Sequence, residues 1–197
     1  DTGDGGIRRV VEHQMKLLPK LHIDFTEDPA DADVIACHIS IPPQLLKRFP
    51  DKPFVAHCHG LYWTDDGWTD RFHQQINSEV LDCIQRADAV TAPSPWVADS
   101  IKRATWLTNV HTIGHGVDIE EFASPSSGHH GYIYWDKARA DQVCDPRAVN
   151  ILAGSMPELK FVSTFGDETK NNLQVTGVVS YDQHTEYMQH AMLYLAT

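Results

Sequence analysis

The sequence has no long apolar run, no excess of basic residues and few cysteines. Each of these shortages excludes some classes of protein. No stretch approaches the about 20 apolar residues that a membrane-spanning helix needs, and the first residues do not resemble a signal peptide. The 197 residues include 16 Lys and Arg against 27 Asp and Glu, giving a formal net charge of −11. Because a phosphate backbone selects for a Lys/Arg surface, this balance argues against a nucleic-acid partner.

The cysteines are scattered. The four of them, Cys37, Cys58, Cys83 and Cys144, form no CxxC pair. This pattern is neither a zinc framework nor the dense cysteine spacing of a small secreted domain, so we expect reduced thiols in a cytoplasmic protein. A hydrophobic content of 42 % is enough to build a packed core.

Short apolar runs alternate with amphipathic segments along most of the chain. Alternation of this kind predicts parallel β-α-β units, and hence an α/β protein with a doubly wound sheet covered on both faces. In the first half we expect a helix over 5–21, then strands over 32–39, 52–59 and 88–94, with helices over 42–49, 70–87 and 95–104. Over 109–118 we expect a strand that runs into a glycine-containing loop.

A polar segment rich in Ser, Gly and Pro, residues 123–131, interrupts the alternation as a linker would. We therefore divide the chain into a first domain over 1–122 and a second over 132–197. In the second domain we expect strands over 132–135, 159–166 and 173–180, a helix over 146–156, and a last helix from 182 to the end of the chain.

Two histidines stand at the end of the apolar run 52–59. Alternate residues of a strand face the same side, so His57 and His59 could bind one metal ion, as in several metal-dependent hydrolases. His111, His115, Asp65 and Asp66 are the other candidate ligands for such a site. An alternative uses His59 alone, because ligands of open α/β sheets bind beside the carboxyl ends of the strands. Gly60 would then let a ligand approach the backbone; in a third interpretation both histidines are structural.

Two further patterns suit an anionic ligand. Gly5 and Gly6 precede a helix, and a glycine loop at a helix N-terminus can bind an anion. Lys137 and Arg139 follow the apolar run 132–135, where a pair of cations would suit a diphosphate. A solvated loop neutralised by nearby aspartates remains an alternative for the second pattern.

Taken in order, these motifs resemble the retaining family-4 glycosyltransferases of the GT-B fold. The matching pieces are "DGGIRRVVEHQ", "FVAHCHGLYW", "ADAVTAPSPWVADSIK" and "VHTIGHGVDIEEF". The resemblance implies two Rossmann-like, doubly wound domains, the second truncated, and transfer of a sugar from a nucleoside diphosphate sugar to an acceptor hydroxyl with retention of configuration.

The resemblance also implies roles for individual residues. His59 would lie beside the transferred sugar as the catalytic residue, with Gly5, Gly6, Gly60 and Ser94 among the substrate-binding residues. Lys137 and Arg139 would hold the donor diphosphate, although the family spaces this pair differently. His115 replaces the Asn that is usual in the family's interdomain segment.

Two departures from the family pattern indicate a chain that is incomplete at both ends. The strand that normally precedes the glycine pair is missing, so we expect a sheet with two exposed inner edges. The two glutamates that hold the donor would follow after "HAMLYLAT". A non-catalytic nucleotide- or sugar-binding module of the same fold is therefore the second hypothesis, and a metal hydrolase using His57 and His59 is the third.

The resemblance implies no cofactor and no metal. The expected partners are a UDP- or GDP-sugar donor and an unknown sugar, lipid or glycan acceptor. We expect a cytoplasmic protein, with peripheral association at the cytoplasmic face of a membrane as an open alternative. The sequence does not predict an oligomeric state.

Overall fold

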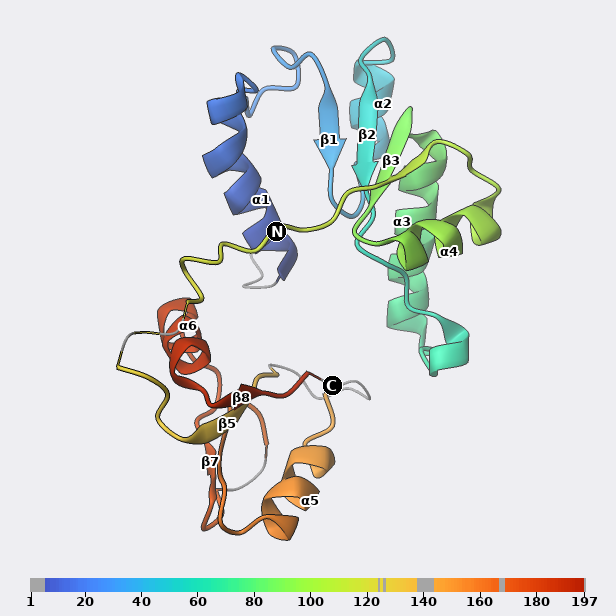
Figure 1. Cartoon of the computed structure of the whole chain (residues 1–197). Coiled ribbons are helices and arrows are strands. Elements are labelled where there is room, and N and C mark those ends of the chain that lie inside the picture. The colour runs from blue at the N-terminus through green and yellow to red at the C-terminus, as the bar shows by residue number, and fades with distance from the viewer. Residues whose placement is uncertain (1–5, 124, 126, 138–143, 167–168, 197) are drawn as a thin grey trace. The chain divides into compact units, whose positions relative to one another are not determined.

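The computed structural model describes residues 6–123, 125, 127–137, 144–166 and 169–196 (Figure 1). The chain divides into two compact units, Asp1–Gly116 and Val117–Thr197. This division lies a little before the domain boundary expected after residue 122, which stays a prediction. Among the described residues, each helix is too short or too polar to pass through a bilayer.

The first unit is built on one parallel sheet in the order β1-β2-β3-β4. Its first three strands are labelled in Figure 1. Its strands are β1 (Ile35–Cys37), β2 (Phe54–His57), β3 (Ala89–Ala92) and β4 (Val110–Thr112). Its helices are α1 (Gly6–Leu17), η1 (Leu18–Leu21), α2 (Pro43–Arg48), η2 (Thr64–Asp66), α3 (Arg71–Arg86) and α4 (Pro95–Thr105). The strands and helices expected from the alternation are therefore present.

Local signals in the sequence set where these helices begin. Asp70 precedes α3, and its carboxylate accepts hydrogen bonds from the backbone N–H groups of Phe72 and His73. Ser94 precedes α4 and its hydroxyl accepts from the Val97 N–H at 3.3 Å, with a proline in the first turn. Both contacts satisfy N–H groups that a helix cannot bond internally.

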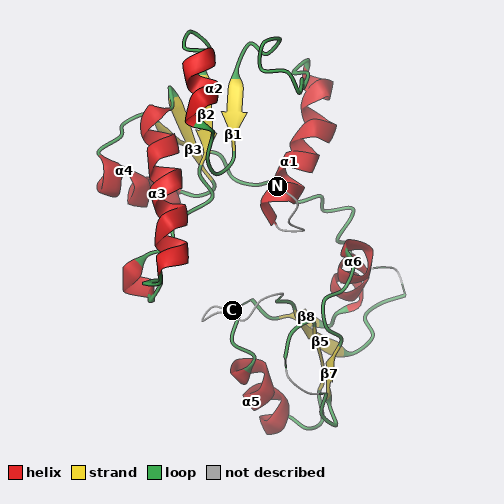
Figure 2. Ribbon diagram, turned by 180° about the vertical axis from the view of Figure 1, so that it is seen from behind, coloured by secondary structure: helices red, strands yellow, loops and turns green. Residues whose placement is uncertain are grey.

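The core of the first unit lies between one face of the sheet and α2, α3 and α4. Figure 2 shows α2 and α3 in front of the strands. In this sheet, neighbouring strands follow one another in the chain. When each connection is a right-handed crossover, all the connecting helices lie on the same face of such a sheet. These three helices therefore cover the face that carries the core. The expected pair of exposed inner edges is wrong among the described residues, because the four strands form one continuous sheet whose edges are β1 and β4.

The second unit also has a parallel sheet, in the order β7-β6-β5-β8. Its strands are β5 (Tyr132–Trp135), β6 (Lys160–Ser163), β7 (Leu173–Val175) and β8 (Leu193–Tyr194), and its helices are α5 (Arg147–Ser155) and α6 (Tyr181–His190). The strand order reverses at β5, which is the doubly wound pattern. Helix α5 packs on the face of Ile133 and Phe161, and α6 covers the face of Tyr132 and Tyr134.

The last helix does not reach the end of the chain as expected. Helix α6 ends at His190, and β8 follows it. The Met192 N–H donates to the Tyr132 carbonyl and the Leu195 N–H to the Tyr134 carbonyl, both at 2.8 Å. Because these two N–H groups bond to carbonyls of β5, they are not available to continue the helix.

Candidate functional site

Four histidines gather at the carboxyl-terminal edge of the first sheet. His38 follows β1, His57 ends β2, His59 lies two residues beyond it, and His115 follows β4. The rings of His38 and His57 are stacked with centroids 4.6 Å apart, and the ring of His59 is 5.2 Å from those of both His38 and His115. Parallel strands bring their carboxyl ends to one edge, so residues distant in sequence meet there.

His57 is held within the strand. Its Nδ1 is 2.7 Å from the Thr91 hydroxyl on neighbouring β3, and the two residues are paired in register. Burial lowers the pKa of His57, which favours the neutral ring. A ring fixed in this way supports the interpretation in which His57 is structural.

His59 is bonded to His38. Its Nε2 lies 3.0 Å from His38 Nδ1, and the His38 Nε2 lies 3.0 Å from the Gln14 side-chain oxygen on α1. Burial, reinforced by the neighbouring imidazoles of His57, His59 and His115, lowers the pKa of His38 to about 4. Burial, together with His115 and His57, lowers the pKa of His59 to about 4. Both rings are therefore neutral at pH 7 and able to accept or donate one hydrogen bond at each nitrogen.

Sequence reasoning missed His38 and Gln14. The available signal was the position of His38, directly after the run that forms β1, at the same edge as the end of β2. The contribution of Gln14 could not be found by this signal, because the place of α1 beside the sheet is a tertiary feature.

Gly60 follows His59 with φ of +136°, a conformation that side chains with a Cβ rarely adopt. A Cβ built at Gly60 would meet no atom within 4 Å. The glycine is thus required by the backbone turn at the strand end, and the space beside it is open.

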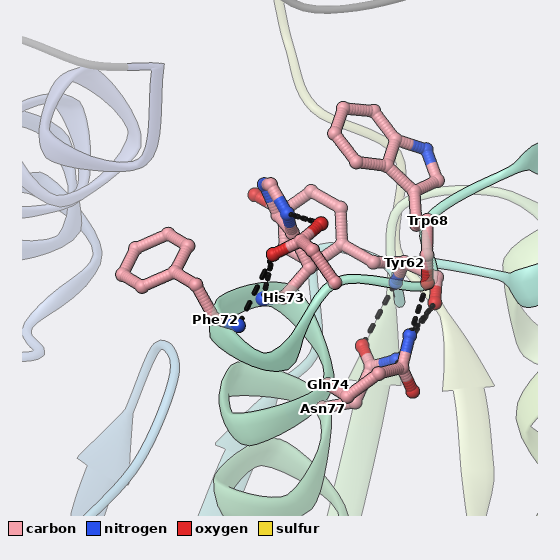
Figure 3. A network of polar contacts seen from close by, with 7 residues as sticks. Tyr62, Trp68, Phe72, His73, Gln74 and Asn77 are labelled. Carbon is pink, nitrogen blue, oxygen red and sulfur yellow. Dashed lines mark hydrogen bonds and ion pairs between the residues drawn. The ribbon is translucent and has the colours of Figure 1, made fainter.

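Tyr62 and Trp68, two of the aromatic residues after Gly60, belong to a network that fixes the loop onto α3 (Figure 3). The Asn77 side chain accepts from the Tyr62 N–H at 2.8 Å and donates to the Tyr62 carbonyl at 2.7 Å. Gln74 donates to the Trp68 carbonyl, and the rings of Tyr62 and Trp68 each lie 4.5 Å from the ring of His73. These aromatics support the loop rather than the histidine cluster.

The predicted glycine pair and Ser94 have simple local settings. Gly6 is the first residue of α1, and Gly5 lies outside the described residues. Ser94 acts as the cap of α4 described above. Substrate binding by these residues stays a prediction.

The described residues supply no further ligands for the metal-hydrolase alternative. Within the part of the chain that the structure describes, no three His, Cys, Asp or Glu side chains are placed to hold one metal ion. His57 and His59 each direct one ring nitrogen at a protein partner, Thr91 and His38 respectively. His111 is exposed on the edge strand β4.

In the second unit, Lys137 lies two residues beyond the end of β5, at the carboxyl edge of the sheet. Its backbone is fixed by Thr164, whose hydroxyl lies 2.9 Å from the Lys137 N and 2.8 Å from the Lys137 O. Arg139 falls in 138–143, outside the described residues. The diphosphate site proposed for this pair stays a prediction.

The same edge carries a cluster of polar side chains that sequence reasoning did not single out. Tyr194 on β8 donates to the Asp136 carboxylate, and His184 Nδ1 lies 3.7 Å from that carboxylate. The Tyr134 hydroxyl is 3.0 Å from His184 Nδ1. Because the strand order reverses between β5 and β8, this group lies where doubly wound sheets place their ligand crevice.

Comparison with known proteins agrees with this architecture. A family model described as Glycosyltransferase Family 4 matches residues 5–121, more than half of the chain. The structure named TarM superposes with a TM-score of 0.57 at 12 % identity, covering 95 % of this chain and 39 % of its own. Two parallel sheets with interleaved helices and this likeness define an α/β protein with two Rossmann-like domains of the GT-B type, present in part.

The chain belongs to glycosyltransferase family 4. Other similar structures are S. aureus MnaA solved with UDP, at TM-score 0.49 and 12 % identity, and Arabidopsis thaliana UGT89C1 solved with UDP, at 0.48 and 13 %. They cover 98 % and 95 % of this chain, which spans 59 % and 55 % of theirs. Comparison with curated protein sequences gives no match.

Proposed function

We propose that this chain is part of a retaining glycosyltransferase that moves a sugar from a nucleoside diphosphate sugar to an acceptor hydroxyl. The observation that carries the proposal is His59, neutral and next to the open turn at Gly60, at the strand edge of a family-4 domain. That edge is where α/β sheets of this type bind their ligands.

In the proposed reaction the acceptor oxygen bonds to the anomeric carbon while the bond from that carbon to the diphosphate oxygen breaks. The electron pair of the broken bond leaves with the diphosphate, which takes the acceptor's proton on the same face. Stabilising the charge that develops on the diphosphate is the main task of the protein, and Lys137 and Arg139 are assigned to it. His59 holds the transferred sugar through a hydrogen bond to one of its hydroxyls.

The test of the reaction is a turnover assay with a panel of UDP-, GDP- and ADP-sugars, preceded by a thermal-shift panel of the same nucleotides. We expect one nucleoside diphosphate to raise the melting temperature, and its sugar to be turned over. Binding without turnover, in this chain and in a longer one that contains it, would favour the binding module instead.

For His59, substitution by alanine should lower kcat by about 100-fold or more while the affinity for nucleoside diphosphate changes little. His111→Ala is the matched control, because His111 is an exposed histidine on β4 of the same sheet. Equal turnover in the His59 and His111 variants would remove His59 from the mechanism.

For the diphosphate, Lys137→Ala should weaken binding of the nucleoside diphosphate by about 10-fold in calorimetry, since one fixed cation is lost. Lys160→Ala is the control, because Lys160 begins β6 and thus lies at the other end of the same sheet. An unchanged affinity in Lys137→Ala would show that the phosphates bind elsewhere.

A further inference from the structure

A line of polar contacts runs from α1 to the end of β2. The Gln14 side-chain oxygen is 3.0 Å from His38 Nε2, and His38 Nδ1 is 3.0 Å from His59 Nε2. All three side chains are partly buried, and they come from α1, the end of β1 and the end of β2. Each contact uses a different nitrogen of His38, so this ring joins the other two residues.

The contact between Gln14 and His38 determines which ring nitrogens of His38 and His59 carry a proton. An amide oxygen only accepts hydrogen bonds, so His38 carries its proton on Nε2. A neutral imidazole has one N–H, so His38 Nδ1 is an acceptor. His59 must then donate from Nε2, which leaves its Nδ1 without a proton.

The Nδ1 of His59 is open to a ligand. In the described part of the chain, the only buried side-chain polar atoms without a partner are Thr185 Oγ1 and His190 Nδ1. His59 Nδ1 also has no hydrogen-bond partner among the described side chains, so it must reach solvent. This nitrogen can therefore accept a hydrogen bond from a ligand that reaches the strand edge.

We infer that His38 is a positioning residue, which with Gln14 holds His59 in the tautomer that presents an acceptor at Nδ1. A neutral acceptor binds a group that donates, such as a sugar hydroxyl, and repels a phosphate oxygen. This inference rests on the proposed function for its ligand, but the tautomer itself is a property of the free protein. Helix α1 thus contributes to the site through the side-chain oxygen of Gln14.

The direct test is ¹⁵N–¹H correlation spectroscopy of the histidine rings at pH 7.5, which separates protonated from unprotonated ring nitrogens. In the wild-type chain we expect His59 to show a protonated Nε2 and an unprotonated Nδ1. A protonated Nδ1 on His59 would overturn the inference, because His59 Nε2 would then be the acceptor and His38 Nδ1 the donor.

Variants of His38 give the matched comparison. His38→Asn keeps an acceptor at the place of Nδ1, because the Asn side-chain oxygen occupies a similar position, and should preserve the His59 tautomer. His38→Leu removes the acceptor at similar volume and should give a mixture of the two tautomers. Gln14→Leu is a second variant, on a helix with no buried residue, and should also mix them. A pure wild-type tautomer in both Leu variants would overturn the inference.

Turnover then separates this inference from the proposed function. We expect His38→Leu to lower kcat by about 10-fold with unchanged affinity for nucleoside diphosphate, and His38→Asn to restore most of the loss. If His59 has the inferred tautomer but His59→Ala keeps full turnover, the proposed role of His59 fails and the positioning by His38 stands. If His59→Ala loses turnover while His38→Leu loses none, His38 does not position the reaction.

Discussion

The two faces of the first sheet are formed by the same strands but differ in role: one packs against helices, and the other leads to the histidine cluster. Residues at alternate positions, such as Phe54, Ala56 and Val90, point to α2, α3 and α4 and are at most 2 % exposed. The residues between them, such as Val55, His57 and Thr91, are only partly buried and include polar groups. The strand period of two thus separates the residues that stabilise the fold from those that lead to the histidine cluster.

The largest expected effect comes from making the same substitution on each face. Val90→Ala removes apolar atoms from a fully buried site and should lower the free energy of unfolding by about 2 kcal/mol, from lost transfer energy and a residual cavity. Val55→Ala on the neighbouring strand should cost less than about 1 kcal/mol, because Val55 is already partly exposed. Urea unfolding measures both, and equal losses would show that the two faces are equally packed.

An effect of intermediate size should appear when the pH is lowered. Above the ordinary histidine pKa of about 6.5, His38 and His59 are neutral both folded and unfolded and leave stability unchanged. Below it the unfolded chain binds protons that the folded chain, with both pKa values at about 4, does not bind. The free energy of unfolding should therefore fall as the pH drops from 6.5 towards 4.

The control for this pH dependence is the double variant His38→Asn with His59→Asn, which cannot titrate in this range. Its urea midpoint should change less than the wild-type midpoint between pH 6.5 and 5, above the range in which most carboxylates take up protons. Parallel profiles for the two proteins would mean that the histidine cluster does not contribute.

The smallest expected effect concerns the cap of α4. Ser94→Ala should lower the free energy of unfolding by about 1 kcal/mol, because the Val97 N–H loses its acceptor. Ser94→Asp keeps an acceptor and should restore the stability. If Ser94→Ala weakens nucleotide binding but leaves stability unchanged, Ser94 belongs to the ligand site rather than to the helix.

Local chemistry made much of the fold predictable. Prolines and caps such as Asp70 and Ser94 mark the helix starts, and apolar runs mark the strands. The end of the last helix could not be predicted in this way. Residues from Met192 on read as a continuation of α6, and only pairing with β5 makes Leu193 and Tyr194 a strand.

The candidate site was predictable in part for the same reason. His59 was found because the residues before it form a strand and Gly60 follows, which is a local pattern. His38 was not singled out, because its importance comes from a contact with His59, 21 residues away, across two adjacent strands. Gln14 required in addition the position of α1 beside the strand ends.

The sequence by itself determined the α/β class, the family motifs and the strand end that carries His59, because periodicity, caps and turns act between residues near in the chain. Only the tertiary structure decided which face of the first sheet is covered, that β8 pairs with β5, and which histidines meet. Those features depend on strand order and on contacts between distant segments. Neither is encoded in any short stretch of the sequence.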